Sequence, residues 1–211
     1  MKRIISVALF AATALTAGSF TIDDYSVGQG PIITSTVPTT ITDGPLAIGG
    51  GISRLITLET LAALQPPAFQ VEAGFGVFDV NNGTGDDSQV TVDYTIPALP
   101  IPPGASNVEF FLTIVQSDAN PTSVDLSGVA SGSFSIAPNT LNQTVFFSVP
   151  GVAFGPGTLT LTFNGAPGWD LSVDSFGVQW KDRSPVPEPS TIGLIGAGLI
   201  GLGILRRKQI A

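Results

Sequence analysis

The sequence predicts an all-β fold, an antiparallel β-sandwich or jelly roll of about nine or ten strands, with a short apolar helix at each end of the chain. Apolar and polar residues alternate with a period of two over short runs, and the 3.6-residue periodicity of amphipathic helices is nearly absent. Gly, Pro, Asn and Asp cluster between these runs, as in turns. The expected body, residues 19–185, is one domain's worth of chain.

The N-terminal segment, residues 1–18, has the parts of a secretory signal peptide. Lys2 and Arg3 are followed by an apolar run and then by small residues, so we expect a signal helix that is removed on export. Two places offer a small-residue cleavage point, the stretch Ala12-Thr13-Ala14 and the stretch from Ala17 to Ser19.

The body contains nine runs that predict strands. The clearest is 89–96, where Val90, Val92 and Tyr94 alternate with polar residues. The others are 20–25, 52–58, 69–80, 108–115, 132–136, 144–149, 159–163 and 171–180. One short segment, 58–64, is a weak helical candidate that ends before a pair of prolines.

The last predicted strand changes its apolar phase near Asp174. Leu171 and Val173 share one parity, whereas Phe176 and the apolar residues after it fall on the other. A β-bulge would turn both sets toward the core and would leave Asp170, Ser172 and Asp174 on one face.

Charge and composition exclude several function classes. Between the two terminal segments, three basic residues stand against fifteen acidic ones, a net charge of −12, so this body repels nucleic acid and anionic lipid. There is no cysteine, hence no disulfide and no thiolate site. There is also no histidine, which excludes Ser-His-Asp and Cys-His catalysis. No arrangement of residues indicates an enzyme, and no cofactor is predicted apart from calcium.

A calcium site is one interpretation of the segment 79–87. Its oxygen-bearing side chains, Asp79, Asn81, Asp86 and Asp87, are of the type that calcium prefers. The spacing departs from the EF-hand pattern, and Asn82-Gly83 is also a strong hairpin signal. A solvated hairpin without metal is therefore the alternative.

Sugar-binding sites commonly use exposed aromatic rings, and the chain has few amphipathic ones. Trp169 follows Pro167-Gly168 in an expected turn and is predicted to be exposed as a ligand-binding ring. Trp180 is predicted to be in the core.

The C-terminal segment, residues 186–211, has three parts. Pro187, Glu188 and Pro189 form an extended, accessible stretch. The run 192–205 is apolar but only fourteen residues long with five glycines, shorter than the usual ~20 of a stable span, which favours transient membrane anchoring. Arg206, Arg207 and Lys208 follow it and are expected to stay cytoplasmic.

In order and spacing this segment resembles the PEP-CTERM sorting signal, with Pro187, Glu188 and Pro189 as its recognition motif and Arg206, Arg207 and Lys208 as its stop signal. The resemblance implies an exported bacterial protein that an exosortase processes near the motif, after transient inner-membrane anchoring through 192–205. It also implies delivery to the cell surface or extracellular matrix of a bacterium that makes exopolysaccharide.

The body itself is similar to galactose-binding-like jelly rolls. The similarity rests on Ile22-Asp23-Asp24-Tyr25, on Leu171-Ser172-Val173-Asp174, and on Gly49-Gly50-Gly51-Ile52-Ser53-Arg54. The resemblance implies a jelly-roll fold. The sorting signal and the lack of a catalytic arrangement together favour a non-enzymatic surface or matrix protein associated with exopolysaccharide. The alternatives are a carbohydrate-binding module and a glycan-active enzyme.

Overall fold

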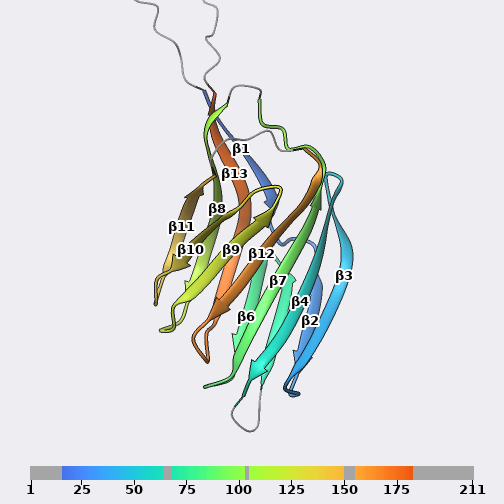
Figure 1. Cartoon of the computed structure of the whole chain (residues 1–211), viewed down its shortest axis with the longest axis vertical. Helices are drawn as coiled ribbons and strands as arrows, with labels where there is room; N and C mark the ends of the chain where they lie inside the picture. The colour runs from blue at the N-terminus through green and yellow to red at the C-terminus, as the bar shows by residue number, and fades with distance from the viewer. Residues whose placement is uncertain (1–15, 64–67, 103–104, 150–154, 183–211) are drawn as a thin grey trace, which may run out of the picture. The chain divides into compact units, whose positions relative to one another are not determined.

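Two antiparallel sheets face each other across one hydrophobic core in the computed structural model of the chain (Figure 1). The model describes residues 16–63, 68–102, 105–149 and 155–182, which form thirteen strands and contain no helix. The strands are β1 (Thr16–Asp23), β2 (Gln29–Thr34), β3 (Thr39–Gly49), β4 (Ile52–Ala62), β5 (Phe69–Gly74), β6 (Val77–Asn82), β7 (Asp87–Ile96), β8 (Ser106–Ser117), β9 (Thr122–Gly128), β10 (Gly132–Ile136), β11 (Leu141–Ser148), β12 (Gly157–Gly165) and β13 (Leu171–Asp182).

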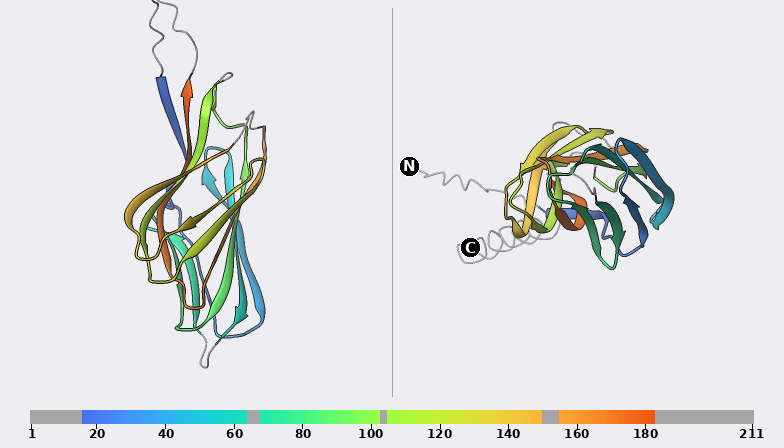
Figure 2. Two further views of the ribbon diagram at one scale, coloured as in Figure 1. Left: turned by 60° about the vertical axis from the view of Figure 1, so that its left-hand side comes forward. Right: turned by 90° about the horizontal axis from the view of Figure 1, so that it is seen from below.

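The seven-stranded sheet has the order β11-β8-β13-β6-β5-β2, and β1 also pairs with β13. The six-stranded sheet has the order β10-β9-β12-β7-β4-β3. Figure 2 shows the two layers from two further directions. Consecutive strands often lie in different sheets, so the connections cross between the layers, as in a jelly roll.

The core is built by the predicted alternation. In β7 every second residue is buried, and Val90, Val92 and Tyr94 are fully buried. The all-β sandwich predicted from the sequence is thus confirmed. Each Å² of apolar surface that is buried stabilises the fold by about 25 cal/mol. Because the chain has no cysteine and hence no disulfide, this buried core is the main source of its stability.

The number of strands exceeds the predicted nine or ten in the described residues. β2, β3 and β9 were not predicted, and the run 69–80 is divided into β5 and β6 by a tight turn. The helical candidate 58–64 is wrong as far as it is described, because residues 58–62 continue β4. Pairing with β7 through Glu59, Thr60 and Ala62 holds this segment in the sheet.

The predicted bulge in the last strand is confirmed. The pairing of β13 with β8 shifts between Val173 and Ser175 and passes over Asp174. Leu171 and Val173 on one side of the bulge, and Phe176 and Val178 on the other, are all buried. The bulge therefore turns both apolar sets toward the core.

The compact unit spans Ala17–Asp182, and its first strand starts inside the segment predicted as a signal peptide. β1 begins at Thr16, and a side chain at Gly18 would lie 2.6 Å from the ring of Trp180 in β13. The expected signal helix within 1–18 and the expected membrane helix 192–205 fall in ranges outside the described residues. Within the described ranges no helix is long and apolar enough to cross a membrane.

We expect the exported protein to begin at Leu15 and to lack Arg206 and the residues after it. Cleavage after Ala14 leaves β1 whole, whereas cleavage after Gly18 would remove its first three residues, including the glycine that packs against Trp180. Intact-mass and N-terminal peptide analysis of the exported form measures both ends. An N-terminus at Ser19 would contradict the first expectation, and an intact tail on surface material would contradict the second.

Candidate functional site

A groove lies between the β1–β2 loop and the strands β5 and β6, and it has a volume of about 370 Å³. Ser26 and Gly28 of the loop line one side, together with Gln29, Gly30 and Pro31 at the start of β2. The other side is formed by residues of β5, β6 and the turn that joins them: Glu72, Ala73, Gly74, Phe75, Val77 and Asp79.

Phe75 is the most exposed large apolar side chain of the described residues, with a relative exposure of 107 %. It occupies a two-residue turn, because Gly74 pairs with Val77, and its φ is 55° while that of Gly76 is 83°. Positive φ at both positions is the geometry of a tight type I′ hairpin, and it is uncommon for a bulky residue. The turn thus holds an aromatic ring in solvent at the groove.

The same turn is attached to the opposite wall of the groove. The backbone N–H of Gly76 donates to the carbonyl oxygen of Tyr25, 3.1 Å away, and Tyr25 also has a positive φ of 51°. Backbone strain of this kind persists where the surrounding structure enforces it, often at binding sites. The two walls are therefore fixed to each other rather than independent.

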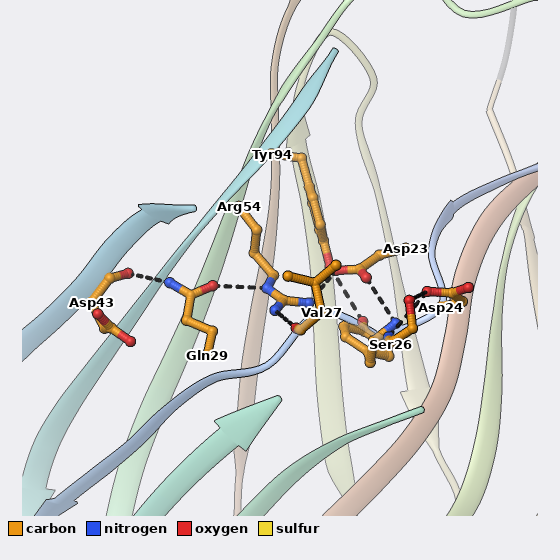
Figure 3. A network of polar contacts seen from close by, with 9 residues as sticks. Asp23, Asp24, Ser26, Val27, Gln29, Asp43, Arg54 and Tyr94 are labelled. Atoms are coloured by element: carbon orange, nitrogen blue, oxygen red, sulfur yellow. Dashed lines mark hydrogen bonds and ion pairs between the residues drawn. The ribbon is translucent and has the colours of Figure 1, made fainter. Parts of the chain in front are cut away.

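A buried guanidinium orders the loop wall (Figure 3). Arg54 of β4 donates from Nη1 to Asp23 Oδ2 at 2.7 Å, from Nε to Gln29 Oε1 at 2.8 Å and from Nη2 to the Val27 carbonyl at 2.6 Å. The Arg54 and Asp23 side chains are 0 % and 2 % exposed. One side chain of the six-stranded sheet thus binds the end of β1, the loop and the start of β2.

Two tyrosines complete this network. Tyr94 donates its hydroxyl to Asp23 Oδ2 at 3.1 Å, and the Arg54 guanidinium carbon lies 5.5 Å from the centre of the Tyr25 ring. Burial raises the pKa of Asp23 although Arg54 opposes the shift, and burial also raises the pKa of both Tyr25 and Tyr94. Both phenols are therefore neutral at neutral pH.

A second hollow of about 350 Å³ lies on β2, β5 and β6, at the end of β5 and β6 that is farther from Phe75. It is lined by Ile33 of β2, Gln70 of β5 and Asn81 of β6, among others. These three residues stand side by side, since Ile33 pairs with Gln70 and Gln70 with Asn81. In the next row Glu72 pairs with Asp79, and Ser172 of β13 donates its hydroxyl to Asp79.

The predicted exposure of Trp169 is wrong. Its ring is fully buried, and its Nε1 donates to the Ser88 carbonyl at 3.0 Å. The turn at Gly168 is covered by the β6–β7 connection, where the N–H of Gly168 donates to the Asp86 carbonyl at 2.6 Å. A ring without exposed surface offers no face to a sugar, so Trp169 belongs to the core.

The structure separates the residues of the predicted calcium site. Asp79 and Asn81 point to the outer face of β6, whereas Asp86 is buried and its Oδ2 accepts from the N–H of Ala68 at 2.7 Å. Asp87 begins β7 in the other sheet. Within the described ranges, no group of three or more His, Cys, Asp or Glu side chains is arranged to hold a metal. Calcium binding stays a prediction that this arrangement does not favour.

The hairpin alternative for this segment is wrong. β6 pairs with β5 and β13, while β7 pairs with β4 and β12, so Asn82-Gly83 starts a crossover between the sheets. Asn82 is buried there and donates from Nδ2 to the Trp169 carbonyl at 2.5 Å. Two of the three residues of the predicted oxygen-rich ladder at β13 have partners within the protein. Ser172 donates its hydroxyl to Asp79, and the Asp170 carboxylate accepts from the N–H of Asn82 at 2.8 Å.

Sequence reasoning missed Phe75 and Arg54 as site residues. Both had a signal. Gly74 and Gly76 flank Phe75 inside one apolar run, which indicates a two-residue turn with an exposed centre. Arg54 has the same strand parity as Ile52 and Ile56, which places it on the inward face of β4.

The C-terminal segment matches the PEP-CTERM protein-sorting motif over residues 185–208. The chain therefore carries the sorting signal that the sequence indicated, and this signal marks a protein that is exported and transiently anchored in the membrane before exosortase processing. The motif residues Pro187, Glu188, Pro189, Arg206, Arg207 and Lys208 lie outside the described residues.

Among solved structures, the chain is similar to the carbohydrate-binding module TmCBM61, determined in complex with beta-1,4-galactotriose. The identity is 11 %, the TM-score is 0.31, and the match covers 74 % of this chain and 89 % of that one. No curated protein sequence matches the chain.

Proposed function

We propose that this protein is a non-enzymatic surface or extracellular-matrix protein, delivered by the exosortase pathway, whose body binds the exopolysaccharide through the groove at Phe75. The observation that supports this most is the fully exposed ring of Phe75, held in a tight turn beside a hollow lined mainly by apolar and glycine residues with a few polar side chains among them. Sugar rings have apolar faces edged by hydroxyls, and a fixed aromatic side chain with neighbouring polar groups is suited to both.

The residues around the ring also fit a binding role. Ser26 offers a hydroxyl group, while Glu72 and Asp79 offer carboxylate acceptors. Because the Arg54 network fixes the loop wall beforehand, little ordering is needed when a ligand binds. With neither histidine nor cysteine in the chain, catalysis by imidazole or thiolate is excluded, and no sequence motif selects a catalytic pair among the carboxylates, which favours binding without chemistry.

The variant Phe75→Ala is expected to lower the affinity for the cell's own exopolysaccharide at least tenfold, or about 1.4 kcal/mol. The loss follows from the removal of the exposed ring, which supports no other part of the fold. Affinity electrophoresis of the exported protein in gels that contain the purified polysaccharide measures the change.

Phe146→Ala is the matched control, since Phe146 is an exposed phenylalanine (49 %) on β11, away from the groove. Equal retardation of parent and Phe75→Ala would refute the site. Release of reducing sugar from the polysaccharide by the parent protein would instead support the glycan-active enzyme.

A further inference from the structure

The two hollows of the seven-stranded sheet belong to one strip on its outer face. Alternate residues of β5 and β6 point outward, namely Gln70 and Glu72 on β5 and Asp79 and Asn81 on β6. The strip extends four residues along β5, from Gly74 beside Phe75 to Gln70, which is about 13 Å. Both hollows open onto this strip, so one extended ligand can occupy them together.

Among the residues that the structure describes, the middle of the strip carries two carboxylates and no cation. Glu72 and Asp79 are directly opposite in the β5–β6 pairing, an arrangement in which like charges repel. Arg54 is fully buried in its network, and Lys181 lies nine residues beyond Ser172 along β13, about 30 Å away. That distance exceeds the screening length of about 8 Å at physiological salt.

We infer that the ligand of this groove is an uncharged polysaccharide and that Glu72 and Asp79 set this specificity by excluding anionic chains. The inference rests on the proposed function, since the hollows and Phe75 define the site and the carboxylates decide which glycan enters it. A carboxylate accepts hydrogen bonds from sugar hydroxyls, whereas it repels the carboxylate of a uronic acid at the same position. The net charge of −12 adds repulsion of the same sign.

The experiment compares one polysaccharide in two charge states. A panel of neutral glucans, mannans, galactans and xylans is screened by affinity electrophoresis with the exported protein, and the one that binds is oxidised at its primary hydroxyls to carboxylates. At 150 mM salt, roughly the physiological ionic strength, the oxidised form should bind at least tenfold more weakly than its parent polymer.

The double variant Glu72→Gln with Asp79→Asn should reduce this discrimination, the ratio of the two affinities, to less than threefold, even though both polymers lose two carboxylate acceptors. Asp79→Asn retains an oxygen that can accept from Ser172, so the fold is expected to persist. The matched control is Glu59→Gln with Asp125→Asn, which removes two exposed charges from the other sheet. The control should retain the full discrimination.

Equal binding of both polymers by the parent protein, with Phe75→Ala defective on both, would overturn the inference and leave the proposed function standing. Discrimination that the control variant reduces as much as the groove variant would also overturn it, because net charge would then be the cause. Binding of no polymer in the panel, and none of the cell's own polysaccharide, would overturn the proposed binding function and this inference together.

Discussion

Replacing Arg54 with leucine is expected to lower the free energy of unfolding by about 3–5 kcal/mol, the usual cost of removing one partner of a buried ion pair. The change leaves the Asp23 carboxylate buried without its cation and removes the donors to Gln29 and the Val27 carbonyl. Because these contacts order the groove wall, glycan binding should weaken as well. Urea denaturation of the exported protein measures the change in the free energy of unfolding.

The pH dependence of this loss identifies its origin. Burial already raises the pKa of Asp23, and removal of Arg54 takes away the interaction that lowers it. The folded variant then binds a proton at Asp23 more readily than the unfolded chain, so its stability rises as the pH falls through the folded pKa. The difference from the parent should shrink from pH 7 toward pH 5. Lys181→Met, at an exposed position, should cost less than about 0.5 kcal/mol. A pH-independent loss at Arg54 would contradict the ion-pair explanation.

The second large effect is expected at Trp169, where alanine should cost about 3–5 kcal/mol of stability. The ring fills a fully buried position, and a side chain at Gly165 would collide with it, so the site is closely packed. Trp169→Phe retains most of the volume but loses the hydrogen bond to the Ser88 carbonyl, so a smaller loss of about 1–3 kcal/mol is expected. A loss below about 1 kcal/mol for alanine would mean that the ring is not in the core.

The strands that sequence reasoning identified are those with a clear contrast between two faces. β7 shows why this works, because its Val90 and Val92 are buried while Thr91 and Asp93 are not. β2 and β3 lack that contrast, since they lie at the ends of their sheets and each contains a proline. Edge strands tolerate proline and need only one partner, so their sequences resemble turns.

The site was harder to predict than the fold because it depends on contacts between residues far apart in the sequence. The exposure of Trp169 was inferred from its own turn, yet the crossover after β6 covers that turn. The same crossover was read as a hairpin, since Asn82-Gly83 does not encode which sheet the next strand joins. The partners of Arg54 at Asp23 and Gln29 lie 31 and 25 residues away, beyond any local pattern.

The pairing of β13 bears on how the chain acquires its fold during export. This strand contacts β1, β6 and β8, and it ends at Asp182, just before the sorting motif begins at residue 185. The strand that closes the seven-stranded sheet is therefore among the last to leave the export channel. Non-local pairing of this kind is slow to form. A tail that anchors the chain transiently in the membrane gives the last strand time to dock before the tail is processed.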